Sequence, residues 1–395
     1  MWRSLSKQTL SPVSSLMWRS LSKQTLPSSL SLFKDVLEPD SESALQFIDL
    51  MEYSYMRSIL MELKKASIKE ILNSRVKEIT FEGKVVVDTS PLGSTLYVRD
   101  FYSRLYDQLF NSRRAILIGN PGISKSWFHW YILYKLLHDA DCPFKVIIRQ
   151  AGQQKMAFIF PQHCQVFQTR QKEDWIHVLE RIKPDIALYL VEPLDSLQEP
   201  IDTVMKTIIT CSPDMRRYHE FNKKGGEMYY MPVWELDELL SVGGHIQSHI
   251  TDEELKQELT PEKIKARYHQ FGGIFRYVIP DSLAMIRIAK RNQRDALNFT
   301  NPSHVFRPEA NIEKRDEIME NISHFILQYK VEYGGKHEGA ADEFTNFQLD
   351  IASDCVRDQL HKGRRISDTE FESLVLELNS EFLQANSTKS FLFEL

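Results

Sequence analysis

Cysteine is scarce in this chain of 395 residues, and metal-binding patterns are missing from it. Its four cysteines are widely scattered and form no C-x-x-C pair, and its histidines do not cluster. A zinc site is therefore not predicted, because such sites need closely spaced cysteine and histidine ligands. The pattern favours free, buried thiols in a reducing compartment, with a secreted protein carrying unpaired thiols as the alternative. The four are Cys142, Cys164, Cys211 and Cys355.

The sequence also lacks a long hydrophobic run and an excess of one charge. No stretch approaches about 18 consecutive apolar residues, so no membrane span is predicted. The net charge is -5 and the pI about 6.2. These values exclude both a global polycation suited to nucleic acid and an acidic disordered chain, although local basic patches stay compatible with them. Hydrophobic residues make up 42% of the chain, which is ample for globular cores, and the length favours two or three domains.

The first part of the chain contains a duplicated decapeptide. Residues Met1–Leu10 recur without change at Met17–Leu26, in a Ser-rich and basic segment whose first acidic residue is Asp35. A structural repeat needs three or more copies to bury a core, so the copy indicates a recent duplication or a gene-model artefact. We expect a disordered tail. An organelle transit segment is the alternative, whereas a secretory signal fits poorly because an apolar run is missing.

A strand, a loop and a helix follow one another at residues 115–135. The apolar run Ala115–Ile118 is typical of a buried strand, the chain then breaks at Gly119–Gly122, and apolar residues return at helical spacing from Trp127. This order is the one that the phosphate-binding pattern G-x-x-x-x-G-K-[ST] requires, in which loop N–H groups, a lysine and a hydroxyl hold phosphates and Mg²⁺. Gly119, Lys125 and Ser126 match the pattern.

The second glycine of the pattern is replaced by Ser124. If the backbone there is left-handed, a side chain is penalised by about 1–2 kcal/mol, so we expect weakened nucleotide binding or slowed hydrolysis. The alternative is an ordinary turn that carries a surface lysine by chance. We predict that the nucleotide is contacted by Gly119, Asn120, Pro121, Gly122, Ile123, Ser124, Lys125, Ser126 and Trp127. Lys125 is also a candidate catalytic residue, because it would stabilise charge on the terminal phosphates.

Two further apolar strands end in polar groups. The strand from Asp185 ends at Glu192, where P-loop ATPases place a carboxylate that contacts the Mg²⁺ shell or polarises the attacking water. Glu192 is therefore a candidate for catalysis and, with Ser126, for metal binding, and Asp195 is the alternative. An ordinary loop carboxylate is the other interpretation. The strand 204–211 ends near Thr210 and Ser212, which are candidate phosphate sensors.

Several arginines lie after these strands. Arg216 and Arg217 are each a candidate arginine finger for a neighbouring nucleotide, or else surface residues. Further along, a predicted helix ends at the pair Gly272-Gly273 and the chain resumes with Arg276. A lid that points a cation at bound phosphates needs such an arrangement, so Arg276 is a candidate catalytic residue. The alternative is that the glycines only end the helix.

These patterns predict an α/β fold. Alternating strands and helices favour a doubly wound, mainly parallel sheet of the P-loop NTPase class, followed by a C-terminal helical lid and a further α-rich C-terminal region. We divide the chain into a tail (residues 1–40), a helical and strand lead-in (41–94), a P-loop core (95–230), a helical lid (231–300) and an α-rich region (301–395).

Five motifs in a fixed order resemble a known family. They are Gly119–Phe128, Leu190–Pro193, Ser212-Pro213 with Tyr218–Phe221, Tyr230–Trp234 and Phe271–Tyr277. Together they resemble the ATPase module shared by Crinkler effectors and trypanosome retrotransposon-hot-spot proteins, over about residues 95–290. The family's module is an AAA-type P-loop ATPase, which is often joined to an N-terminal targeting header and a C-terminal effector domain such as a nuclease.

The resemblance implies nucleotide contact by Gly119, Gly122, Lys125 and Ser126, an acidic role for Glu192 and a lid role for Arg276. Three features depart from the family pattern: Ser124 replaces a glycine, Phe275 stands where proline is common, and no Crinkler header is visible in residues 1–94. The resemblance leaves the location open between the interior of the producing cell and secretion into a host cell.

We therefore predict an ATP-binding protein that acts as a weak or slow Mg²⁺-dependent ATPase, with effector function as the family's implication. The alternative is a degenerate, non-hydrolysing P-loop module that binds a protein or nucleic-acid partner. Expected cofactors are ATP and Mg²⁺. The partners compatible with this prediction are a nucleotide, a second copy of the chain in a homo-oligomer, and a protein or nucleic acid.

Overall fold

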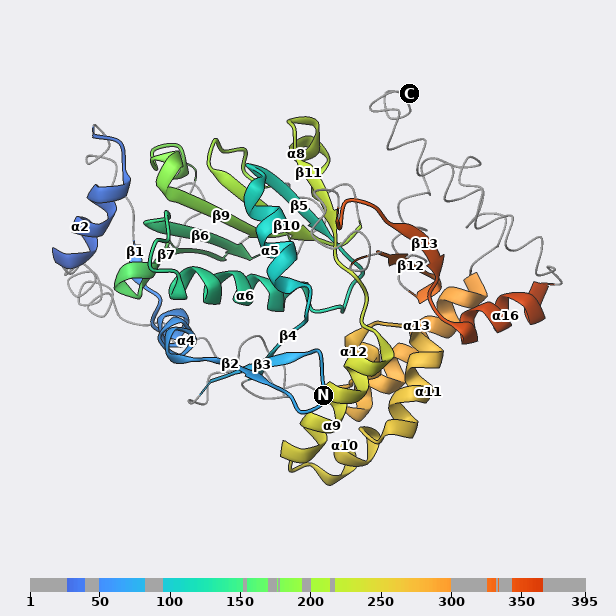
Figure 1. Cartoon of the computed structure of the whole chain (residues 1–395). Coiled ribbons are helices and arrows are strands. Elements are labelled where there is room, and N and C mark those ends of the chain that lie inside the picture. The colour runs from blue at the N-terminus through green and yellow to red at the C-terminus, as the bar shows by residue number, and fades with distance from the viewer. Residues whose placement is uncertain are drawn as a thin grey trace, which may run out of the picture.

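A computed structural model describes most of the chain (Figure 1). The described residues are 27–39, 50–81, 95–151, 155–169, 176, 178–193, 200–213, 217–299, 325–331, 333 and 343–364. The duplicated decapeptide, Asp195 and Arg216 lie outside them. Within this part of the chain, no helix is both long enough and apolar enough to cross a membrane.

An eight-stranded sheet forms the centre of the molecule. Its strand order is β1-β8-β7-β6-β9-β10-β5-β11. The strands from β6 to β11 in this order pair in parallel, whereas β7, β8 and β1 continue the sheet in antiparallel fashion. The bounds are Leu50–Glu52 (β1), Arg114–Ile118 (β5), Val146–Ala151 (β6), Lys155–Phe160 (β7), Gln165–Thr169 (β8), Ala187–Glu192 (β9), Lys206–Cys211 (β10) and Glu227–Tyr230 (β11).

The parallel strands have the composition that burial on both faces requires. In β5 the residues Ala115–Ile118 are buried, and in β9 the residues Ala187–Val191 are. Parallel sheets are covered on both faces, so their strands consist of continuous apolar runs. The predicted α/β class with a mainly parallel sheet is confirmed. The apolar runs 155–160 and 163–167 of the sequence predict a hairpin, and β7 and β8 form it.

Helices α5 (Tyr102–Asn111) and α6 (Lys125–His138) lie across one face of this sheet (Figure 1). Helix α4 (Ser54–Lys65) packs against α6. Apolar residues at helical spacing over 41–72 predict a helix with a break near Ala66. The break is confirmed, since α4 ends at Lys65, but the helix is wrong at residues 50–52 and 68–70; residues 41–49 lie outside the described ones. Residues 50–52 form β1, and β2 (Ile68–Glu70) begins a small antiparallel sheet with β3 (Lys77–Thr80) and β4 (Thr95–Val98).

Five helices follow the sheet: α9 (Leu236–His249), α10 (Glu253–Glu258), α11 (Pro261–Phe271), α12 (Phe275–Val278) and α13 (Leu283–Phe299). The pair Gly243-Gly244 in the sequence predicts the end of the first of these helices, which is wrong. Helix α9 runs through both glycines, because Gly243 packs against Ile264 of α11 and a Cβ there would overlap that side chain. The glycine permits close helix packing rather than a break.

The described residues of the C-terminal part include strands as well as a helix. Strands β12 (Leu327–Lys330) and β13 (Gln348–Ile351) form an antiparallel pair, followed by α16 (Asp354–Arg364). Apolar spacing in the sequence predicts helices over 312–331 and 349–360. The first is wrong at residues 327–330, and its residues 312–324 lie outside the described ones; the second overlaps α16. In β12 the Tyr329 ring stacks on Tyr230 at the end of β11, with centroids 5.9 Å apart.

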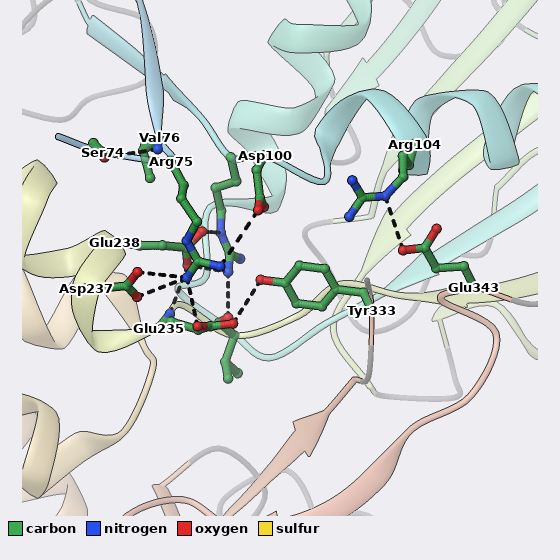
Figure 2. Close-up of polar contacts among 12 residues, drawn as sticks. Ser74, Arg75, Val76, Asp100, Arg104, Glu235, Asp237, Glu238, Tyr333 and Glu343 are labelled. Atoms are coloured by element: carbon green, nitrogen blue, oxygen red, sulfur yellow. Dashed lines mark hydrogen bonds and ion pairs between the residues drawn. The ribbon is translucent and has the colours of Figure 1, made fainter. Parts of the chain in front are cut away.

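One buried ion pair and several exposed ones join α9 to the segments beside the central sheet. Arg99, just before α5, reaches both carboxylate oxygens of Glu238 in α9 at 3.0 and 2.7 Å, and both side chains are fully buried. Figure 2 shows the surrounding network, in which Arg75 contacts Glu235 and Asp237. Losing one partner of a buried pair destabilises a protein by about 3–5 kcal/mol, so this network fixes α9 against the sheet domain.

The network extends to the C-terminal part of the chain. The Tyr333 hydroxyl donates to Glu235 at 3.2 Å, and Arg104 of α5 donates to Glu343 at 3.2 Å (Figure 2). Tyr333 thus joins the network around Glu235, and a separate ion pair joins α5 to Glu343.

Candidate functional site

The loop between β5 and α6 turns tightly, because two of its residues have a left-handed backbone conformation. Gly122 has φ of 81° and Ser124 has φ of 76° and ψ of 34°, both left-handed. Ser124 is the N-cap of α6 and makes no capping hydrogen bond with its side chain. The serine therefore adopts the conformation that the motif's glycine would adopt, at a cost of about 1–2 kcal/mol. This confirms the backbone strain expected from the sequence.

Protein groups hold the carbonyls of this loop. The Trp234 Nε1–H donates to the Ile123 carbonyl at 3.0 Å, and the Arg276 backbone N–H donates to the Gly122 carbonyl at 3.1 Å. In a trans peptide the N–H points opposite to the C=O, so the N–H groups of Ile123 and Ser124 face away from these two donors. Outward carbonyls and inward N–H groups are what an anion-binding loop needs.

Lys125 is the first residue of α6, and its side chain folds back over the loop. Its Nζ donates to the carbonyls of Gly119 at 2.7 Å and Asn120 at 2.9 Å. Burial lowers the pKa of Lys125 to about 8; Cys211 and Glu192 oppose this shift, and Arg276 and Arg217 add to it. Among the described residues, the hydrogen-bond partners of the ammonium are these two neutral carbonyls, and a bound anion would stabilise its charged form.

A carboxylate from a different strand meets the residue after the lysine. The Ser126 hydroxyl donates a hydrogen bond to Oε1 of Glu192, at the end of β9. The other oxygen, Oε2, lies 3.6 Å from the Arg149 guanidinium of β6. The two predicted metal-site residues are therefore brought together, even though β10 separates β9 from β5 in the sheet.

Arg149 was missed by the sequence analysis. Its guanidinium also lies over the Trp130 ring, 5.0 Å from the centroid, which fixes it beneath α6. The one available signal was a single basic residue within the otherwise apolar start of β6, Val-Ile-Ile-Arg. Periodicity cannot say which neighbouring strand such a residue faces.

The junction between α11 and α12 lies against the loop. Gly272 ends α11 with φ of 67°, and a Cβ on Gly273 would overlap the Trp234 carbonyl. Arg276 is the second residue of α12, and its side chain is exposed. A Cβ on Gly122 would lie 3.1 Å from Arg276 Cβ, so this arginine starts directly beside the phosphate-binding pattern.

The other residues that the sequence suggested for the site lie in different surroundings. Thr210 shares a hydrogen bond of 2.9 Å with His129 Nε2, so its hydroxyl is directed to α6. Burial, with help from Arg149, lowers the pKa of His129 to about 3, which keeps that ring neutral. Ser212 is half-buried. Arg217 donates to the Pro193 carbonyl at 2.7 Å, next to Glu192.

Trp127 lies on the side of the loop that faces the helices. Its ring contacts Phe275 of α12 and Tyr97 of β4, with centroids 5.0 and 5.8 Å apart. It is half-buried, so its fluorescence should respond to a ligand at the loop.

Clustered metal ligands are missing from the described part of the chain, where no group of three or more His, Cys, Asp or Glu residues could hold a metal ion. Mg²⁺ does not need one, because it is usually bound by one or two carboxylates together with substrate phosphates and water.

Residues 116–304, just under half of the chain, match the family model described as "Retrotransposon hot spot protein, P-loop domain". This segment is similar to that domain and contains the loop, Glu192 and the helices α9–α13. A P-loop domain indicates nucleotide binding. No curated protein matches the chain significantly.

Proposed function

We propose that this protein binds ATP with Mg²⁺ at the loop Gly119–Ser126 and hydrolyses it slowly. The observation that carries the proposal is the meeting of Ser126 and Glu192 beside Lys125, since these residues come from a helix and from a strand two positions away in the sheet. A turn bearing a lysine by chance would not bring a hydroxyl and a carboxylate together there.

The residues present fit the proposed cofactors. The loop N–H groups and Lys125 suit phosphate oxygens, and the Ser126 hydroxyl with the Glu192 carboxylate offers the oxygen ligands that Mg²⁺ prefers. Mg²⁺ supplies neutralisation of phosphate charge at such a site. Around it, this chain provides further positive charge from Arg276 and Arg217, both of which act on Lys125 electrostatically.

Turnover is proposed to be slow for two reasons. Ser124 places a Cβ where the backbone approaches phosphate closely. Glu192 already has Ser126 on one oxygen and Arg149 beside the other, so it must exchange partners before it can polarise water. The same two contacts favour the second candidate function, a P-loop module that binds nucleotide without hydrolysing it and serves a protein or nucleic-acid partner.

The wider expectations from the family resemblance are part of this proposal. An AAA-type oligomeric ATPase and a Crinkler-type effector role are supported by the order of motifs from Gly119 to Tyr277. The fixed position of Arg276 beside the loop supports the lid role of that arginine.

Ligand-dependent thermal stability tests the binding step. At about 100 times its dissociation constant, a ligand that binds only the folded protein adds about 2.7 kcal/mol, which is easily measured. We expect MgATP to raise the melting temperature of the wild type and not that of Lys125→Ala. Lys223→Ala, which removes an exposed lysine of α8 (His219–Lys223), is the matched control and should behave like the wild type. An equal shift in Lys125→Ala would refute the site.

Phosphate release separates the two candidate functions. The ATPase proposal predicts slow release that is abolished in Glu192→Gln, while that variant still binds nucleotide. Release that is undetectable in both proteins, with MgATP binding intact, would favour the non-hydrolysing module.

A further inference from the structure

Helix α13 carries four cations on its outward face. Arg287, Lys290, Arg291 and Arg294 are all exposed. With about 100° of rotation per residue, they fall within an arc of about 100°, and with a rise of about 1.5 Å per residue they extend over about 10 Å of the helix axis. We call these four residues the basic stripe. The protein as a whole is acidic, so the stripe is a local concentration of positive charge.

The basic stripe is not neutralised within the described part of the chain. No hydrogen bond or ion pair involves any of its four side chains there. The neighbouring helices differ in this respect. On α10 and α11, Lys256 pairs with Glu253 at 3.5 Å, and Lys263 and Arg267 pair with Glu258.

Like charges three and four positions apart on a helix repel each other. The stripe contains such neighbours throughout, for example Arg287 with Arg291 and Lys290 with Arg294. Asp295, four positions after Arg291, is the acidic residue of α13; it is exposed and forms no ion pair with the stripe in the described part of the chain. A helix that keeps these repulsions is stabilised when a polyanion binds. Three of the four residues are arginines, which bind phosphate in bidentate fashion.

The opposite face of α13 is already used for packing. Ala289 is fully buried, and Gln293 is buried and donates to the Gln270 carbonyl of α11 at 2.7 Å. A helix that lies on a membrane surface needs a free apolar face, which α13 does not have. Among the side chains of α13 whose exposure the structure describes, residues 283–297, none is aromatic; aromatic residues anchor protein interfaces, and single-stranded bases stack on them.

We propose that the basic stripe of α13 binds the phosphate backbone of double-stranded nucleic acid, and that this binding does not depend on base sequence. Duplex DNA carries about one negative charge per 1.7 Å of its axis, which suits a short, straight row of cations. The basic stripe shares no residue with the loop Gly119–Ser126. Duplex binding by the stripe therefore does not depend on nucleotide binding by the loop.

Fluorescence anisotropy with a labelled DNA duplex of about 20 base pairs tests the proposal through the salt dependence of binding. Four phosphate contacts predict a slope of log K against log salt of about -3.6, which is a loss of about 150-fold between roughly 50 and 200 mM salt. The triple variant Arg287→Gln/Arg291→Gln/Arg294→Gln should reduce the slope to about -0.9 and bind at least tenfold more weakly at low salt.

A second triple variant, Lys64→Gln/Lys65→Gln/Lys69→Gln, removes the same charge from exposed positions on α4 and β2 and should keep the wild-type slope. Melting curves confirm that each variant folds. An RNA duplex should bind like DNA, and a single strand more weakly. Equal losses in the two triple variants, no duplex binding at low salt, or a preference for single strands, anionic vesicles or polyglutamate would overturn the proposal.

Discussion

Replacing Ser124 by glycine should stabilise the protein. Ser124 is held at φ of 76° and ψ of 34°, where a residue with a Cβ is penalised by about 1–2 kcal/mol. Glycine removes this penalty. It also raises the conformational entropy of the unfolded chain, which reduces the gain in stability by about 0.5–1 kcal/mol. The side chain makes no capping hydrogen bond, so its removal adds little. The net expectation for Ser124→Gly is a gain of about 0.5–1 kcal/mol in the free energy of unfolding, or a few degrees in melting temperature.

Urea and thermal unfolding followed by circular dichroism measure this gain. Ser124→Ala is the matched control, because it removes the hydroxyl and keeps the Cβ, and it should unfold like the wild type. Gly122→Ala reverses the change at a second left-handed position, where a Cβ would also lie 3.0 Å from Ile274, and it should destabilise the protein. If Ser124→Gly were no more stable than Ser124→Ala, the loop would not be strained at this residue.

Two other predictions concern the lysine and the α11–α12 junction. Because burial lowers the pKa of Lys125 to about 8 and bound phosphates favour its charged form, nucleotide affinity should be constant below about pH 8 and fall up to about tenfold per pH unit above it. Titrations of Lys125→Arg, which stays charged, should show no such fall. Gly272→Ala should lose at least about 3 kcal/mol in urea unfolding, because φ is 67° and a Cβ would overlap the Ala352 carbonyl. Gly244→Ala, within α9 and without a neighbour inside 4 Å, should instead gain about 0.5–1 kcal/mol.

The sequence was most informative where one signal decides the structure. The buried strands β5 and β9 contain continuous apolar runs, and the break Gly-Asn-Pro-Gly before Lys125 predicts a loop. The strain at Ser124 was predictable because the motif specifies a glycine there. The approach of Glu192 to Ser126 was predictable only through the motif, since spacing along the chain does not specify which strands are neighbours.

The failures come from contacts between segments distant in sequence. Gly243 suggested the end of a helix, but in the structure its missing Cβ leaves room for the Ile264 side chain of α11. Residues 327–333 alternate apolar and polar side chains, which indicates a strand, but the helical spacing over 312–331 hid this signal; in the structure β12 pairs with β13, and Tyr329 packs on Tyr230. Arg149 could not be assigned to the site without knowing that β6 lies beside β9.

Equilibrium titration of the purified protein with a fluorescent ATP analogue, with Mg²⁺ and with the metal chelated, tests the central claim most directly. The account predicts saturable binding that weakens when Mg²⁺ is removed and disappears in Lys125→Ala. It also predicts that Ser126→Ala binds nucleotide with little dependence on Mg²⁺. No binding by the wild type, or equal binding by Lys125→Ala, would contradict the claim that the loop Gly119–Ser126 holds a nucleotide.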